Sequence, residues 1–229
     1  MREWTIAAAQ YVDCGQTIAE KIANHLRFVQ AAASQHCNAL LFPELSLTGA
    51  CADALPPSPD PSLLQPLARA AHHYGIAIIA GVPIEADGVR QPGVAIFSPD
   101  AETDTAFYPG QSACLNPQAE HTLHFPTPND PSELPAQASL LGIGTCTCGC
   151  QQQQSVQKLQ RVAHKYAIAV LKSNYAGGSA LWDENGRLIV RADAGELLLV
   201  GRQCAGGWQG DLIPLSACPV PIDEIACGA

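Results

Sequence analysis

The sequence predicts an α/β protein, and three observations point to that class. Short apolar runs bounded by turn residues recur along the chain, as expected for buried strands. A segment with helical periodicity separates the first two runs, so strand, helix and strand follow one another as in a βαβ unit. The 229 residues, 47% of them hydrophobic and 14% charged, suffice for one large domain with a substantial core.

Strands are predicted where an apolar run ends at Gly, Pro, Asn or Asp. They span residues 4–10, 39–42, 76–83, 93–97, 138–144, 168–174 and 180–182, with two more short strands through Gly201. The run at 39–42 is the most informative, because Pro43 fixes its own φ and cannot continue a β-ladder. Glu44 is therefore expected at the carboxyl end of a buried strand, where α/β proteins usually carry their functional groups.

Helices are predicted at three places, residues 18–33, 62–74 and 151–166. The first is the best defined, because Thr17 and Glu20 form a capping box and apolar residues follow at helical spacing. Residues 108–138 lack periodicity and are rich in Pro, Gln, Asn and Ser, which predicts a long functional loop. The last residues read as irregular, so we divide the chain into a domain at 1–203 and a tail at 204–229.

The composition bears on partners and compartment. The net charge is −9 and the 12 Lys and Arg residues are scattered, which disfavours nucleic acid and anionic membranes as partners. No apolar run is long enough for a membrane span, and residues 1–10 lack a cleavable signal pattern. We therefore expect a cytoplasmic protein whose ten cysteines are mostly buried, reduced thiols rather than a disulfide scaffold.

The order of several segments resembles the carbon-nitrogen hydrolase (nitrilase) superfamily. These are Gln10, Phe42-Pro43-Glu44-Leu45 with Thr48-Gly49, the strand at 76–83, Asn174 with Gly177-Gly178-Ser179, and the turn at 183–186. The resemblance covers roughly residues 4–201. It implies an αββα sandwich that pairs into an αββα-αββα homodimer, and hydrolysis of a small amide or nitrile substrate. No cofactor and no metal are expected.

The resemblance also assigns catalytic roles. It implies that Glu44 is the general base, that Glu120 is a supporting acid and that Cys146 is the nucleophile. The family lysine would follow a tyrosine, but here that place reads Tyr108-Pro109-Gly110-Gln111, and no lysine lies between positions 21 and 158. The catalytic set is therefore incomplete. Lys172 could replace the missing cation if its predicted strand presents it to the pocket.

Two alignments of the nucleophile remain open. In the first, the strand at 139–146 ends in the catalytic Cys146, and Cys148 stands where the family has an acid two positions later. In the second, residues 133–138 are a remnant of the helix after the nucleophile, and the strand carrying it has been deleted near 126–130. We slightly favour the second, because residues 151–174 match a helix and strand that come late in the family.

The cysteines at 146, 148 and 150 could also ligate a metal or form a reversible disulfide. A metal site is weakly indicated, because no second Cys-x-x-Cys or His pair accompanies these cysteines. The favoured interpretation is that they are small side chains filling a tight turn.

Two candidate functions follow from the sequence. One is a carbon-nitrogen hydrolase that stabilises the oxyanion without the family lysine. The other is a catalytically inactive, nitrilase-like protein that acts by ligand binding or protein assembly.

Overall fold

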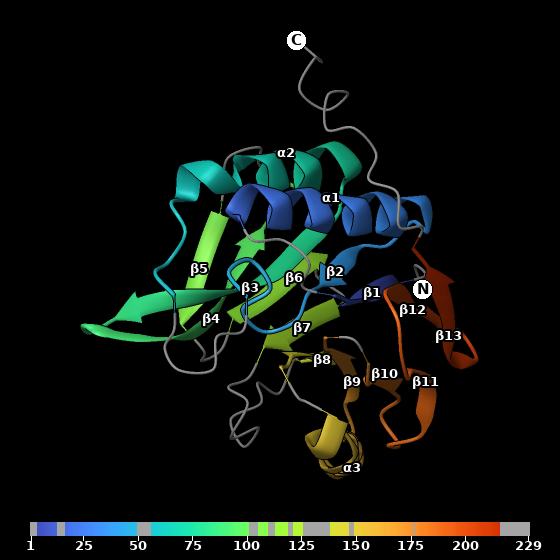
Figure 1. The fold of residues 1–229 in the computed structure, drawn as a ribbon. Helices are drawn as coiled ribbons and strands as arrows, with labels where there is room; N and C mark the ends of the chain where they lie inside the picture. The colour runs from blue at the N-terminus through green and yellow to red at the C-terminus, as the bar shows by residue number, and fades with distance from the viewer. Residues whose placement is uncertain are drawn as a thin grey trace.

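The computed structural model describes residues 4–12, 17–49, 56–100, 105–109, 113–118, 121–125, 138–146, 149–175 and 177–215. Two β-sheets pack face to face between two layers of helix, in the order helix, sheet, sheet, helix (Figure 1). The predicted α/β class and αββα sandwich are therefore confirmed. The dimer predicted with them stays a prediction. No helix within the described ranges is long and apolar enough to cross a membrane.

Among the described residues, the first sheet contains seven strands in the order β13-β12-β1-β2-β3-β4-β5. Their bounds are β1 Trp4–Gln10, β2 Ala39–Leu41, β3 Ala77–Ala86, β4 Val89–Phe97, β5 Thr105–Pro109, β12 Leu197–Cys204 and β13 Gly207–Pro214. β1, β2 and β3 run parallel in its centre, and the outer strands pair antiparallel. Every residue of β1 and β2 is buried, as expected for central parallel strands covered on both faces.

The second sheet, as far as the structure describes the chain, contains six strands in the order β11-β10-β9-β8-β7-β6. Their bounds are β6 Ala113–Gln118, β7 His121–Phe125, β8 Leu140–Gly144, β9 Ala169–Ser173, β10 Ser179–Trp182 and β11 Leu188–Ala192. β7, β8 and β9 run parallel in its centre. The two sheets thus share one plan, with a parallel centre between antiparallel edges.

Three α-helices cover the sheets in the part of the chain that the structure describes. They are α1 Ile18–Ser34, α2 Gln65–Tyr74, which a 3₁₀ turn at Pro61–Leu64 precedes, and α3 Gly149–Tyr166. The capping box at the start of α1 is present: the Glu20 N–H donates to Thr17 Oγ1 at 3.2 Å, and the Thr17 N–H donates to Glu20 Oε2 at 2.9 Å. α1 and α2 cover the first sheet, and α3 covers the second (Figure 1).

The hydrophobic core divides into three layers. One lies between α1, α2 and the first sheet, one between the two sheets, and one between α3 and the second sheet. Alternation along each strand distributes the side chains: Leu40 joins the first layer and Leu41 the second.

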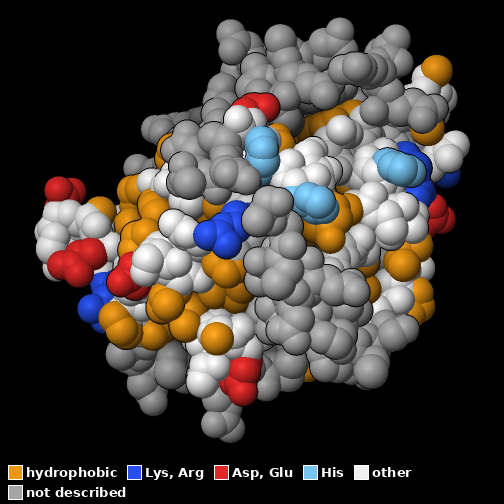
Figure 2. Space-filling view, turned by 90° about the horizontal axis from the view of Figure 1, so that it is seen from above, with side chains coloured by type: hydrophobic (Ala, Val, Ile, Leu, Met, Phe, Trp, Pro, Cys, Tyr) orange, Lys and Arg blue, Asp and Glu red, His pale blue; other side chains and the backbone are white. Residues whose placement is uncertain are grey.

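On the helical face shown in Figure 2, the Lys and Arg side chains of the described residues are few and separated.

Two predictions about irregular segments are wrong. Strands β5, β6 and β7 lie within residues 108–138 or at their edge, where a long loop was expected, and β13 lies within the expected tail. β13 pairs along its whole length with β12, and β7 pairs with β8. These strands carry Pro, Gln and Asn among their apolar residues, so tertiary pairing rather than local pattern makes them strands. Residues 216–229 lie outside the described ranges.

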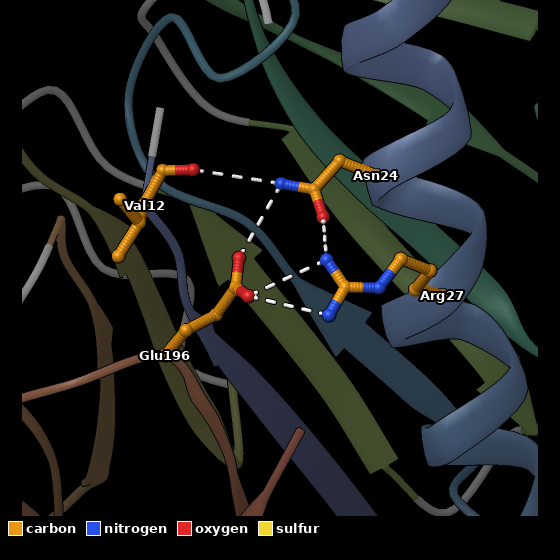
Figure 3. A network of polar contacts seen from close by, with 4 residues as sticks. All are labelled: Val12, Asn24, Arg27 and Glu196. Carbon is orange, nitrogen blue, oxygen red and sulfur yellow. Dashed lines mark hydrogen bonds and ion pairs between the residues drawn. The ribbon is translucent and has the colours of Figure 1, made fainter. Parts of the chain in front are cut away.

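A half-buried polar network ties α1 to the start of β12 (Figure 3). Arg27 pairs with Glu196 at 3.3 Å, and their side chains are 15% and 19% exposed. Asn24 accepts a hydrogen bond from Arg27 at 2.6 Å and donates to the other carboxylate oxygen of Glu196 at 3.4 Å and to the carbonyl of Val12 at 3.5 Å. The network therefore fixes α1 against the chain that leaves β1.

Replacing Glu196 by alanine should lower the free energy of unfolding by about 2 kcal/mol, because Asn24 and Arg27 then lose a partly buried acceptor. Urea unfolding at neutral pH measures the change. Asp193→Ala is the matched control, because it breaks an ion pair with Arg191 in which the Asp193 side chain is 76% exposed. It should lower the free energy of unfolding by less than about 1 kcal/mol. Equal losses in the two variants would contradict a structural role for the network.

Candidate active site

The candidate site lies where the carboxyl ends of β2 and β8 meet between the two sheets. The Phe42 N–H makes the last bond of the β2 ladder, to the carbonyl of Ile79 at 2.8 Å, and Pro43 then ends the strand as predicted. Residues 44–48 form a turn. Glu44 therefore leaves the sheet directly from a rigid strand end.

Two glycines hold the backbone around Glu44 from opposite sides. A Cβ on Gly81 of β3 would lie 2.4 Å from the carbonyl oxygen of Pro43, and a Cβ on Gly144 of β8 would lie 2.8 Å from that of Phe42. Both distances are too short for any side chain. The first sheet and the second sheet thus approach the Glu44 peptide as closely as bare backbone allows.

Hydrogen bonds fix the turn that follows Glu44. The Leu47 N–H donates to the carbonyl of Gly81 at 3.1 Å, and the Gly81 N–H donates back to Ser46 Oγ at 3.2 Å. The Tyr175 hydroxyl donates to the carbonyl of Glu44 at 2.8 Å. Leu45 lies at φ +55°, a conformation uncommon outside glycine, and these bonds stabilise it.

Cys146 shares the site with Glu44. Its backbone N–H hydrogen-bonds the Glu44 carboxylate, and its side chain is exposed, one residue beyond the buried Thr145 that follows β8. Burial raises the pKa of Glu44, and the bond from Cys146 offsets part of that rise. The arrangement brings the backbone of a residue with an accessible thiol against a carboxylate that binds protons more readily than an exposed glutamate.

A buried chain of hydrogen bonds supports the residue before Cys146. Thr145 Oγ1 donates to Asn174 Oδ1 at 2.9 Å, and the Asn174 N–H donates to Ser179 Oγ at 3.0 Å. The Ser179 N–H donates to Gln10 Oε1 at 3.2 Å. Gln10, Asn174 and Ser179 come from two of the segments on which the sequence resemblance rests, and here they act as a scaffold behind the candidate nucleophile.

Of the three predicted catalytic residues, the structure brings Glu44 and Cys146 together. Glu120 lies outside the described residues, as do Cys148, Gly110 and the segment 126–137 on which the second alignment of the nucleophile depends. Tyr108 lies in β5 and packs against the layer between the sheets. Within the described ranges, no group of three His, Cys, Asp or Glu side chains could hold a metal ion.

Lys172 does not face Glu44. Its strand neighbours Leu171 and Val170 belong to the layer between the sheets and to the α3 layer respectively, so alternation puts Lys172 on the α3 face. Gly144, by contrast, touches the Glu44 backbone from the face between the sheets. The hypothesis that Lys172 supplies the missing cation is therefore wrong. Burial, with a smaller effect of Arg191, lowers the pKa of Lys172 to about 8.

The sequence analysis missed three residues that position Glu44: His25, Ser46 and Tyr175. His25 comes three residues after Ile22 and one before Leu26, on the apolar stripe of α1, and a polar residue there was the available signal. Ser46 and Tyr175 carried no such signal, because their roles depend on partners 35 and 131 residues away.

Gly144→Ala should lower the free energy of unfolding by about 1–3 kcal/mol, because the new methyl group overlaps the Phe42 carbonyl. Thermal or urea unfolding measures the loss. Gly206→Ala, at a turn where a Cβ meets nothing within 4 Å, is the control and should be close to neutral. A neutral Gly144→Ala would mean that β2 and β8 are not in the contact described.

The buried Lys172 predicts a stability slope at alkaline pH. Between pH 8 and 10.5 the unfolded chain holds this proton and the folded chain does not, so stability rises with pH by up to about 1.4 kcal/mol per unit. Lys172→Met should remove this rise from urea unfolding curves taken at pH 8 and 10. Lys165→Met, on the exposed face of α3, should keep it. An unchanged slope in Lys172→Met would contradict burial of the ammonium group.

Comparison with known proteins identifies the fold. Residues 5–108 match the sequence pattern of the carbon-nitrogen hydrolase family. Among solved structures, a glutamine-dependent NAD⁺ synthetase from Acinetobacter baumannii is similar, with a TM-score of 0.73 and 17% identity. That match covers 96% of this chain but only 49% of the synthetase, so this chain spans about half its length.

Two further structures are similar over nearly their whole length. A CN-hydrolase superfamily protein from Xanthomonas campestris, with an arsenic adduct in its active site, gives a TM-score of 0.73 at 15% identity, covering 90% of this chain and 92% of that one. An amidase from Nesterenkonia sp. gives 0.67 at 17% identity, covering 86% and 89%. The sequence match over residues 5–108 and the shared fold together support the predicted resemblance of this chain to carbon-nitrogen hydrolases.

Proposed function

We propose that this protein hydrolyses small amides through a covalent intermediate on Cys146, with Glu44 as general base. The observation that carries the proposal is the hydrogen bond from the Cys146 N–H to the Glu44 carboxylate. It holds an exposed thiol and a proton acceptor of raised pKa at one strand end. A carboxyl group poised in this way suits proton transfer nearer neutral pH than an exposed glutamate.

The steps balance with these two residues. Glu44 takes the proton of the Cys146 thiol, and the thiolate forms a bond to the amide carbon. Protonated Glu44 then gives its proton to the nitrogen, the C–N bond breaks and ammonia or an amine leaves a thioester. Glu44 next takes a proton from water, the hydroxide oxygen attacks the thioester, and the carboxylic acid leaves as the thiol regains its proton.

The oxyanion in these steps needs hydrogen-bond donors, and here the chain departs from its family. Lys172 lies on the opposite face of the second sheet, and Pro109 follows Tyr108 where the family pattern leads to a lysine. The loss of one such donor costs about a hundredfold or more in turnover. This departure favours the second candidate, a protein that binds an amide or assembles with a partner without hydrolysing its ligand.

Peptide mapping after reaction with fluoroacetamide tests the nucleophile. In a variant of the Nesterenkonia amidase, the acetamide moiety of this compound is added covalently at the active site cysteine. We expect a selective adduct at Cys146, with the half-exposed Cys204 as the internal control. Equal, slow modification of all thiols would overturn the role of Cys146. Saturable binding of an amide without an adduct would favour the second candidate.

Ammonia release from small amides tests the base. Glu44→Gln should lower kcat/KM by about a hundredfold or more, while Glu85→Gln, at an exposed position on β3, should not change it. In the wild type, kcat/KM should rise with pH as Glu44 loses its proton, with a midpoint above the ordinary range of glutamate. Full activity in Glu44→Gln would contradict the proposed mechanism.

A further inference from the structure

A buried histidine lies behind the Glu44 turn and takes no part in the proposed chemistry. His25 is fully buried on the inner face of α1, with its ring 4.1 Å from that of Phe42 and 5.1 Å from that of Tyr11. Its Nε2 lies 3.0 Å from Ser46 Oγ, and its Nδ1 lies 2.7 Å from the carbonyl of Lys21. A polar group this deep needs both partners to offset its burial.

The partners determine which nitrogen carries the proton. A carbonyl oxygen only accepts, so Nδ1 must carry the hydrogen and donate to Lys21. Nε2 is then the acceptor, and the Ser46 hydroxyl donates to it. Burial lowers the pKa of His25 to about 3, and the nearby Lys21 charge acts in the same direction, so the imidazole stays neutral. The tautomer and the direction of each bond are thereby set.

The chain of bonds continues to Glu44. Ser46 Oγ accepts the Gly81 N–H, while the Gly81 carbonyl accepts the Leu47 N–H, so both backbone polar groups of one β3 residue hold the turn. The acceptor on His25 fixes the hydroxyl rotor of Ser46 and thus leaves its lone pairs facing Gly81. The same turn carries Glu44 two residues earlier, in the strained stretch that includes Leu45.

We propose that His25 is a positioning residue for Glu44: its Nε2 orients the Ser46 hydroxyl, which locks the Glu44 turn onto β3 and keeps the carboxylate against the Cys146 N–H. The inference rests on the proposed function in treating Glu44 as the base. It adds a residue from the opposite side of the first sheet to the site. His25 contacts neither the thiol nor the carboxylate, and acts only through the backbone.

Two substitutions of His25 distinguish its hydrogen bond to the Lys21 carbonyl from its hydrogen bond with Ser46. Asn at position 25 can keep a donor for the Lys21 carbonyl but loses the acceptor for Ser46, whereas Gln can extend an acceptor toward Ser46. The backbone amide of Cys146 reports on Glu44 through their hydrogen bond, so its NMR shift followed against pH gives the Glu44 midpoint without any turnover. His72→Asn, on the exposed face of α2, is the control.

We expect His25→Asn to lower the Glu44 midpoint toward its ordinary value by about half a pH unit or more, since a loosened turn exposes the carboxylate. His25→Gln should stay closer to wild type. Ser46→Ala should reproduce the Asn effect, and adding His25→Asn to it should shift the midpoint no further. Ser46→Ala also provides the test if His25→Asn does not fold.

Wild-type midpoints in both His25 variants, or equal shifts in the two, would overturn the proposal, because His25 would then serve only to pack α1. So would additive shifts in the double variant. The outcome is independent of the proposed function: a wild type that titrates as expected but releases no ammonia contradicts hydrolysis and leaves the positioning role intact. In an active enzyme, His25→Asn should lower kcat several-fold more than it raises KM.

Discussion

The site depends on the close contact between the ends of β2 and β8. Gly81 and Gly144 let backbone from both sheets touch the peptide of Glu44 with no side chain between them. A Cβ on Gly144 would push the two sheets apart locally, and a Cβ on Gly81 would displace the Glu44 turn from β3; either change would move the carboxylate away from Cys146. The three apolar layers of the fold hold the two sheets together and so keep the ends of β2 and β8 in contact.

Around this contact, buried polar groups form hydrogen bonds that hold the backbone near Glu44 and Cys146 in place. Thr145, Asn174, Ser179 and Gln10 form one buried chain behind Cys146, and Ser46 with His25 form another behind Glu44. Each member has its partner, which is the condition under which a buried polar network rigidifies a core. The two residues proposed to react are thus held from opposite sheets by separate networks.

The difference from the pattern of carbon-nitrogen hydrolases lies in charge rather than in shape. The fold is similar to that of solved carbon-nitrogen hydrolases, but Lys172 is directed into the α3 layer, where burial disfavours its charged form. The proposal of binding without turnover rests on this difference, because no lysine takes the place that the family pattern gives it.

The sequence alone determined the central strands, the capped α1, and the strand end that presents Glu44, because short-range apolar patterns, a proline and a capping box specify them locally. It did not predict β5, β6, β7 or β13, whose mixed composition becomes strand only through pairing with distant segments. The side of the sheet that Lys172 faces was likewise settled by the register of β9 between β8 and β10. Tertiary structure alone joined Glu44 to Cys146 and His25 to Ser46, since residues 102 and 21 positions apart meet only when the two sheets and α1 are packed.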